Sequence, residues 1–298
     1  MSEAENVLRM NSDLRDAWLE NPDYTYDDIR RIFEDWLDQF EIPEGSIFEE
    51  ADLGGVPCLW AKAPGSSADR VIIHYHSGGY LIGSARGYRS FGGFLSAATG
   101  CRVLLPDYRL APDHPFPAGV DDALSVYRGL LEAGAAPSKI VLCGDSAGGG
   151  LCLVTLLRIR DAGLPPPAGG IAISPLADFT HSGASRQSNE GVDPLVTMKQ
   201  LLAMGDTYCG DRSRSDPLLS PVFADWRGAS PLLLMAGEIE MLRDDARLCA
   251  QAAISAGVEV TYLEGKEMAH IWPLYADRLS QARDSLSDID WFVRRWMG

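Results

Sequence analysis

The sequence predicts an α/β fold built on a doubly wound, mostly parallel sheet. Short apolar runs at residues 71–77, 102–108 and 139–145 have the composition of strands that are buried on both faces. Helical stretches separate these runs, and the alternation of strand and helix is the pattern of repeated βαβ units. The chain has 298 residues, a length that such folds reach around a single sheet. We therefore expect one main domain, at residues 46–298.

The residues that precede this domain are expected to be helical. The segment YTYDDIRRIFEDWLDQF has apolar side chains at the spacing of one helix face, namely Ile29, Ile32, Phe33, Trp36, Leu37 and Phe40. An amphipathic helix of this kind needs a surface to cover. We predict that residues 1–45 form cap helices that pack on the main domain.

The elements of the sheet then follow in a regular order. A hairpin is predicted at 46–64, with Gly54 and Gly55 near its turn. The strand at 71–77, a helix at 87–100 that ends at Gly100, and the strand at 102–108 form the first βαβ unit. Further helices are predicted at 120–134, 146–163, 247–257 and 287–297, and further strands at 139–145, 169–175, 230–237 and 258–265.

One long segment interrupts this alternation. Residues from about 177 to 221 are polar and helical in character and have no strand pattern of their own. An insertion of this length between two strands suggests a lid. We therefore predict a cap insertion at about 177–221, which together with residues 1–45 covers the active site.

Composition and charge exclude several classes of function. The fractions of apolar and charged residues, 46% and 23%, are those of an ordinary globular protein. A formal net charge of −16 repels phosphate backbones and anionic lipid surfaces. No run approaches the ~18 apolar residues of a membrane span, and the start resembles no signal peptide. We expect a cytoplasmic protein without nucleic-acid or membrane partners.

No metal or cofactor site is indicated. The six cysteines are scattered without a CxxC pair, so neither a zinc site nor a redox motif is predicted. Several of them lie in apolar runs, where a thiol packs as a small hydrophobic side chain. The glycine-rich segments lack the G-x-G-x-x-G spacing of a dinucleotide-binding loop.

The strongest chemical signal is the pentapeptide Gly-Asp-Ser-Ala-Gly at 144–148, a G-x-S-x-G motif between a predicted strand and a predicted helix. A serine on such a turn adopts a strained backbone conformation, so the residues two before and two after it must be small. Gly144 and Gly148 meet this need. The N-terminus of the following helix directs N–H groups toward the reacting centre. Ser146 is therefore the candidate nucleophile.

A second glycine motif, His-Ser-Gly-Gly, occupies residues 76–79 directly after a predicted strand. Consecutive glycines can turn their N–H groups toward a carbonyl oxygen without interference from side chains, as an oxyanion hole requires. A plain glycine turn is the alternative, and the nucleophile motif downstream favours the oxyanion hole. The candidate N–H donors are those of Gly78, Gly79 and Ala147.

These motifs resemble those of the hormone-sensitive-lipase-like α/β-hydrolases, the bacterial family IV esterases. That family carries HGGG, a DYRLAPEHPFPA-like segment and GDSAGG, and this chain has HSGG, DYRLAPDHPFPA (107–118) and GDSAGG in the same order. The resemblance covers nearly everything beyond residue 45, and it implies an α/β-hydrolase fold with a helical cap and ester hydrolysis without a cofactor. The departure is Ser77, where the family has glycine. Because both donor glycines follow Ser77, we expect the oxyanion hole to be retained.

The chain order of the catalytic groups in this fold class, serine, acid and then histidine, selects the candidate base. Of the five histidines, only His270 follows the last predicted strand; the others are His74, His76, His114 and His181. The segment MAHIW around His270 also resembles the family's PHxW segment.

The candidate acid lies in the segment after the penultimate strand. Glu238, Glu240, Asp244 and Asp245 are available there, and the last two are also suited to a helix start. Aligning EMLRD with the DPLRD-like segment of the family places Glu240 at the position of the acid. Asp244 and then Glu238 remain the alternatives.

The resulting hypothesis is a carboxylesterase that acts on small esters with short acyl chains through an acyl-enzyme intermediate. A lactone hydrolase with the same triad is the nearest alternative. An amidase or peptidase of the same fold and a non-catalytic ligand-binding member of the family are further alternatives, and the presence of His270 argues against the last. Side chains predicted to line the pocket are Tyr80, Met204, Tyr208, Leu242 and Trp272. The resemblance also implies a homodimer.

Overall fold

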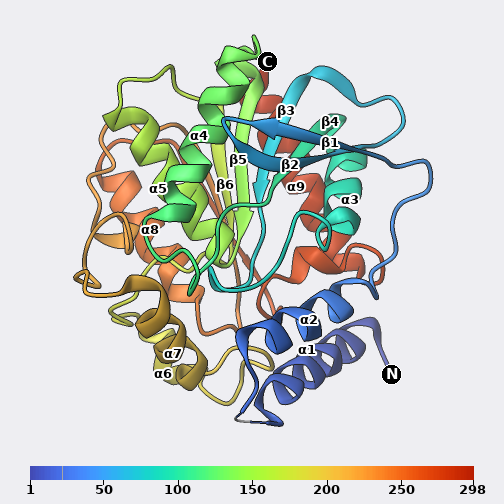
Figure 1. Cartoon of the computed structure of the whole chain (residues 1–298), viewed down its shortest axis with the longest axis vertical. Helices are drawn as coiled ribbons and strands as arrows, with labels where there is room; N and C mark the ends of the chain where they lie inside the picture. The colour runs from blue at the N-terminus through green and yellow to red at the C-terminus, as the bar shows by residue number, and fades with distance from the viewer. Residues whose placement is uncertain (22) are drawn as a thin grey trace.

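The computed structural model describes residues 1–21 and 23–298, and its strands form a single sheet with the order β1-β2-β4-β3-β5-β6-β7-β8 (Figure 1). The strands are β1 Ile47–Leu53, β2 Val56–Lys62, β3 Ser67–Tyr75, β4 Cys101–Pro106, β5 Ile140–Asp145, β6 Gly169–Ile173, β7 Leu232–Gly237 and β8 Val260–Gly265. The hairpin of β1 and β2 and the pairing of β2 with β4 are antiparallel, and the pairs from β4 to β8 are parallel. The predicted doubly wound, mostly parallel sheet is confirmed.

Helices cover both faces of the sheet. The helices on one face are α4 Ala118–Glu132, α5 Ala147–Asp161 and α8 Arg243–Ser255, and those on the other are α3 Arg89–Thr99 and α9 Ser280–Met297. Neighbouring residues of a strand point to opposite faces, so Ile73 packs against the first group and Ile72 against the second. The six cysteines are buried in these two cores, as their apolar surroundings predict.

Two helices begin earlier than their periodicity predicts. α8 starts at Arg243 rather than 247, and α9 starts at Ser280 rather than 287. The first turns of both helices are rich in polar residues, which hides the apolar stripe. By contrast, α3 ends where predicted, because Gly100 adopts the left-handed conformation (φ 64°) that terminates helices.

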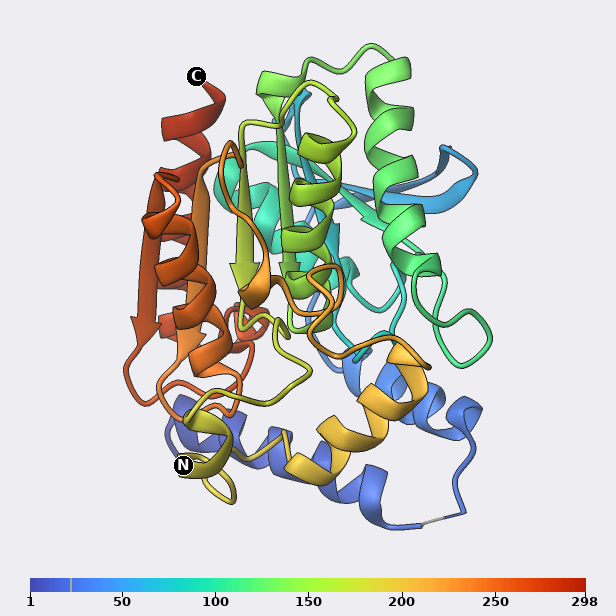
Figure 2. The same ribbon diagram turned by 90° about the vertical axis from the view of Figure 1, so that its left-hand side faces the viewer.

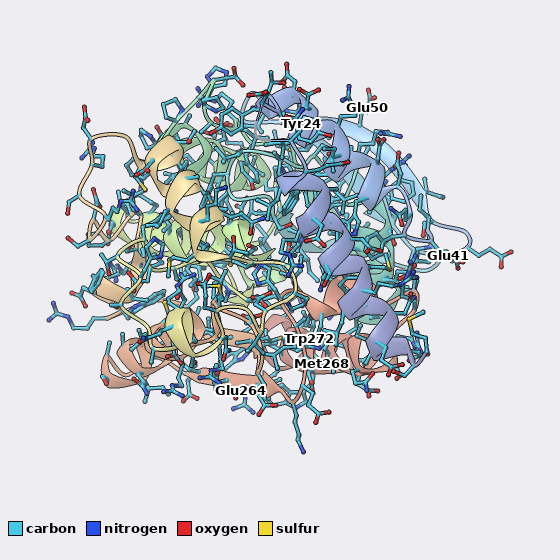
Figure 3. All side chains as sticks on the ribbon, turned by 90° about the horizontal axis from the view of Figure 1, so that it is seen from below. Tyr24, Glu41, Glu50, Glu264, Met268 and Trp272 are labelled. Carbon is cyan, nitrogen blue, oxygen red and sulfur yellow. The ribbon has the colours of Figure 1, made fainter. Side chains whose placement is uncertain are left out.

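Four helices lie below the carboxyl ends of the parallel strands, away from the two layers on the sheet (Figure 2). They are α1 Glu3–Leu19, α2 Tyr26–Leu37, α6 Ser185–Ser188 and α7 Met198–Cys209. The first two come from the N-terminal segment and the others from the insertion at 177–221. Seen from below, α1 and α2 lie on one side and α7 on the other (Figure 3). No helix in the described ranges, 1–21 and 23–298, is long and apolar enough to cross a membrane.

The N-terminal segment is attached to the main domain through Arg30 of α2. Its guanidinium donates hydrogen bonds to the carbonyl oxygens of Leu81 and Ala111 and to the carboxylate of Asp113. Leu81 follows the glycines of the HSGG motif, and the other two acceptors belong to the segment at 107–118. α2 is therefore fixed to both motifs at once.

The insertion is attached through a buried carboxylate of α8. Asp245 Oδ2 accepts hydrogen bonds from the backbone N–H groups of Ala177 and Asp178 and from Nη2 of Arg186, at 2.9, 2.9 and 2.7 Å. The side chains of Asp245 and Arg186 have exposed fractions of 0% and 2%. Removing one member of such a buried pair leaves an uncompensated charge, so this contact stabilises the start of the insertion strongly.

We expect Asp245→Ala to lower the free energy of unfolding by about 3 kcal/mol, because it leaves the Arg186 guanidinium buried without a counter-charge. The matched control is Asp225→Ala, which removes an ion pair between the exposed side chains of Asp225 and Arg227. The control should unfold at the wild-type urea concentration. Equal urea midpoints for all three proteins would contradict the assigned role of Asp245.

Candidate active site

Ser146 lies on a tight turn between β5 and α5 and has a positive φ of 54°. The turn brings backbone segments into close contact. A Cβ at Gly144 would lie 2.1 Å from the carbonyl oxygen of Gly148, and a Cβ at Gly148 would lie 1.9 Å from that of Tyr75. Only glycine fits at either position, which is the steric requirement expected two residues before and after the serine.

Three side chains from separate parts of the chain meet at this turn. His270 Nε2 lies 3.0 Å from Ser146 Oγ, within hydrogen-bond distance. On the other side of the imidazole, Nδ1 lies 3.5 Å from Glu240 Oε2. These side chains follow β5, β7 and β8, whose carboxyl ends share one edge of the sheet. The side chains of His270 and Glu240 are buried, with exposed fractions of 3% and 0%.

Burial and the charge of the partner shift the pKa values of Glu240 and His270 in opposite directions. Burial raises the pKa of Glu240 above its ordinary value, although His270 and the hydroxyl of Ser174 partly offset the increase. Burial also favours the neutral form of His270, but the adjacent Glu240 carboxylate outweighs it and raises the pKa of the imidazole. The Glu240 carboxylate thus stabilises a proton on His270, the property needed of a group that orients a base.

The other acids in this segment have different partners. Asp244 Oδ2 accepts a hydrogen bond from the backbone N–H of Ser185, and Glu238 Oε2 accepts one from that of Glu267. Both carboxylates therefore contribute to the structure of surrounding loops. Of the four acids in this segment, Glu240 is the one that lies within ion-pair distance of His270.

The remaining histidines lie apart from the nucleophile. His114 is exposed, and His181 lies in the insertion, where burial lowers its pKa to about 4. His74 and His76 are buried: His74 Nε2 lies 3.0 Å from Asp145 Oδ1, and His76 Nδ1 lies 2.7 Å from the carbonyl oxygen of Ser77. Both side chains therefore support the loops around the site.

The two glycines of the HSGG motif turn the chain sharply beside Ser146. Their φ angles are 114° for Gly78 and 63° for Gly79, both in the region that favours glycine. Among the hydrogen bonds of residues 1–21 and 23–298, none uses the backbone N–H of Gly78, Gly79 or Ala147 as a donor. Three N–H groups are thus available at the loop and the helix start, the arrangement that stabilises an oxyanion.

Ser77, which departs from the family motif, joins a buried hydrogen-bond network. The Tyr88 hydroxyl lies 2.6 Å from Asp145 Oδ2, 2.5 Å from Ser77 Oγ and 3.1 Å from the backbone nitrogen of Ser77. Because a carboxylate only accepts, the phenol donates its single proton to Asp145 and accepts from both groups of Ser77. Burial raises the pKa of Tyr88 well above its ordinary value, so it stays protonated. This network joins the HSGG loop to the residue that precedes Ser146.

A cavity of about 480 Å³ opens onto Ser146, His270 and the two glycines. Most of its lining residues come from the N-terminal segment and the segment at 177–221, and they include Trp18, Tyr26, Ile29, Phe33, Leu195 and Met204. Met204 packs directly on the HSGG loop, because a Cβ at Gly79 would lie 2.4 Å from its Cε. The lining is mainly apolar, with Lys199 as a charged residue from α7.

Of the five side chains predicted to line the pocket, Met204 does so in the described part of the chain. Tyr80, Tyr208, Leu242 and Trp272 are buried and are not among the described residues that line this cavity. The rings of Tyr80 and Tyr208 stack on each other with centroids 4.0 Å apart, so their faces are used in packing. Trp18, Ile29 and Phe33 line the cavity although no sequence pattern marked them as pocket residues; the helical spacing of the last two predicted only a packing role.

Comparison with known proteins gives a consistent result. Residues 72–274 match the sequence model of a family with the α/β hydrolase fold. An acetyl-hydrolase of Streptomyces hygroscopicus is 35% identical, with 98% of this chain and 95% of the relative covered. An esterase of Acinetobacter venetianus is 33% identical, with coverages of 81% and 80%. The crystal structure of an esterase from the bacterial hormone-sensitive lipase family matches with a TM-score of 0.95 and 38% identity, over 99% of this chain and 98% of that one.

We expect Tyr88→Phe to slow the reaction of Ser146 with a fluorophosphonate probe about tenfold, because the HSGG loop and Asp145 lose their shared partner. The matched control is Tyr127→Phe, which removes a buried phenol hydroxyl that bonds the carbonyl oxygen of Pro165, outside this site. The control should react at the wild-type rate. If Tyr88→Phe reacts as fast as the control, the network does not position the nucleophile.

Proposed function

This chain belongs to the hormone-sensitive-lipase-like esterases of the α/β-hydrolase family, a group of serine hydrolases, and from this premise we propose that it hydrolyses short-chain carboxylic esters through Ser146, His270 and Glu240. The observation that carries the proposal is the alignment of Ser146 Oγ, the His270 imidazole and the Glu240 carboxylate at distances of 3.0 and 3.5 Å. In an unliganded site, such contacts are often long and tighten when substrate binds.

The mechanism has two stages of acyl transfer. His270 Nε2 takes the proton of Ser146 as Oγ attacks the ester carbonyl, and the N–H groups of Gly78, Gly79 and Ala147 stabilise the oxyanion. The imidazolium, stabilised by Glu240, then gives its proton to the leaving alcohol and an acyl-enzyme remains. Water repeats these steps: His270 takes its proton, and Ser146 recovers one when the acid is released.

The cavity supports the choice of a small, uncharged acyl group. Its mainly apolar walls favour hydrocarbon, and its volume of about 480 Å³ is in the range of sites for small molecules. Met204 and the aromatic rings of Trp18 and Phe33 are among the side chains that bound this cavity. The similar protein from Streptomyces hygroscopicus is an acetyl-hydrolase, which agrees with a short acyl group.

We assign the helices below the sheet to a cap in two parts, residues 1–45 and about 177–221, on a catalytic domain at 46–298. The assignment is supported by the cavity walls, which combine Tyr26 and Phe33 from the first part with Met204 from the second. The two parts are also bonded to each other, because the Tyr26 hydroxyl lies 2.7 Å from Thr207 Oγ1 on α7. A cap of this form limits both the size of the substrate and the access of water.

The first test is the hydrolysis of p-nitrophenyl esters from acetate to palmitate. We expect acetate and butyrate to be turned over much faster than palmitate. Ser146→Ala and His270→Ala should abolish turnover, and Glu240→Ala should lower kcat by roughly 10³-fold. Asp244→Ala and Glu238→Ala, the matched carboxylate controls, should retain far more activity than Glu240→Ala. Matched amide and lactone substrates complete the series. If the amide is cleaved faster than the matched ester, the proposed esterase function is refuted.

The pH dependence gives an independent test of Glu240. The base must be neutral, so kcat/KM should fall at low pH as His270 becomes protonated. Because the Glu240 charge raises the pKa of His270, this fall should occur above the ordinary histidine pKa. Glu240→Gln removes the charge and should therefore shift the acid limb of the profile to lower pH. If the acid limb of Glu240→Gln lies at the same pH as that of the wild type, Glu240 does not orient His270.

A further inference from the structure

The backbone of the nucleophile is bonded to the segment that follows β6. The N–H of Ser146 donates to the carbonyl oxygen of Ile173 at 2.9 Å, and the carbonyl oxygen of Ser146 accepts from the N–H of Leu176 at 2.8 Å. Ser174 lies between these two contacts. Any movement of residues 173–176 therefore moves the nucleophile as well.

The side chain of Ser174 contacts Glu240 and the loop that carries His270. Its hydroxyl donates to Glu240 Oε2 at 2.6 Å and accepts from the backbone N–H of Ile271 at 3.0 Å. Ile271 is the residue after His270. Ser174 is fully buried, so water does not compete for this hydroxyl.

The backbone conformation of Ser174 is one that serine rarely adopts. Its φ is 47°, and its N–H is bonded to the carbonyl oxygen of Met235 in β7 at 2.7 Å. A residue other than glycine in this conformation carries strain, which the surrounding structure must offset. In this conformation, the Ser174 hydroxyl contacts both Glu240 and the backbone N–H of Ile271.

Glu240 depends on this hydroxyl for its orientation. Its Oε2 is 2.6 Å from Ser174 Oγ but 3.5 Å from His270 Nδ1. In the described ranges, 1–21 and 23–298, its Oε1 has no hydrogen-bond partner. The bond from Ser174 is therefore the shortest polar contact that holds the carboxylate beside the imidazole.

We propose that Ser174 is a positioning residue of the ester-hydrolysing site, which holds the Glu240 carboxylate toward His270 while its own segment holds the backbone of Ser146. The inference rests on the proposed catalytic roles of these three residues. It also explains how a glutamate can serve as the orienting acid in this chain: the bond from Ser174 restrains a side chain that has one more rotatable bond than aspartate.

Ser174 should also affect the proton affinity of the base. Without the Ser174 hydroxyl the Glu240 carboxylate is no longer held toward His270, so its attraction for the imidazolium weakens. Other groups whose charge acts on the pair are Asp193, which acts on both His270 and Glu240, and Asp145, which acts on His270. These groups keep their places when the Ser174 hydroxyl is removed. Loss of the hydroxyl should therefore lower the pKa of His270.

The decisive experiment is a double-mutant cycle on p-nitrophenyl butyrate. In the wild-type background, we expect Ser174→Ala to lower kcat about tenfold with little change in KM, and to move the acid limb of the pH profile to lower pH. In the Glu240→Ala background, the same substitution should lower kcat by about twofold or less, because the group through which Ser174 acts is gone. A loss that is equally large in both backgrounds would overturn the proposal.

Ser96→Ala is the matched control for removing a buried hydroxyl. Ser96 is also fully buried, donates to the carbonyl oxygen of Cys101 at 2.6 Å and accepts from the N–H of Ala63 at 2.9 Å, within α3 and its surroundings. This variant should lose stability to a similar degree while keeping the wild-type kcat and pH profile. A similar fall in kcat for Ser96→Ala would make the effect of Ser174→Ala structural and would refute a positioning role.

Ser174→Gly guards against misfolding of the alanine variant, because glycine adopts the positive φ without strain. It should show the same fall in kcat and the same pH shift. Two outcomes separate this inference from the proposed function. A fully active Glu240→Ala enzyme would refute the catalytic role of Glu240, whereas an impaired Glu240→Ala enzyme beside fully active Ser174 variants would refute only the role of Ser174.

Discussion

The strained turn at Ser146 is the constraint on which the site depends. A serine with a positive φ at the start of a helix is stable only if the surrounding backbone approaches closely enough to fix it. The approach of Gly148 to Tyr75 provides one side of this support. The bonds from Ser146 to residues 173 and 176 provide the other. Because neighbouring strands and the segments after them fix the turn, the position of Ser146 Oγ depends on several strands and not on β5 alone.

Three buried carboxylates support the segments around this turn, and each has different partners. Asp145 accepts hydrogen bonds from Tyr88 and His74, and Asp245 accepts them from Arg186 and two backbone N–H groups. Glu240 has the Ser174 hydroxyl and the more distant His270 ring. It is thus the least fully bonded of the three carboxylates. A carboxylate held in this way retains the capacity to stabilise a positive charge when His270 takes up a proton.

Local patterns predicted the fold and indicated a candidate nucleophile, whereas the contacts between distant segments did not follow from local patterns. Ser146 was identifiable because the glycine requirement lies within five consecutive residues, and His270 because the order of groups along the chain is restricted. Ser174 carries no such signal, since its partners lie 66 and 97 residues away. The pocket was hardest to predict: Tyr80 and Tyr208 are aromatic and near the site, but they stack on each other instead of facing the cavity.

The helices below the sheet are bonded to the same loops that carry the reacting groups. Arg30 of α2 donates a hydrogen bond to the carbonyl oxygen of Leu81, just beyond the candidate oxyanion donors Gly78 and Gly79, and Met204 of α7 packs on Gly79. In the insertion, Asp193 Oδ2 accepts from the N–H of Met241, the residue after Glu240. A change in these helices that alters the cavity therefore also acts on the oxyanion loop and on the acid. Substrate size and transition-state geometry are coupled through these contacts, so a substitution that enlarges the pocket should be judged by kcat as well as by KM.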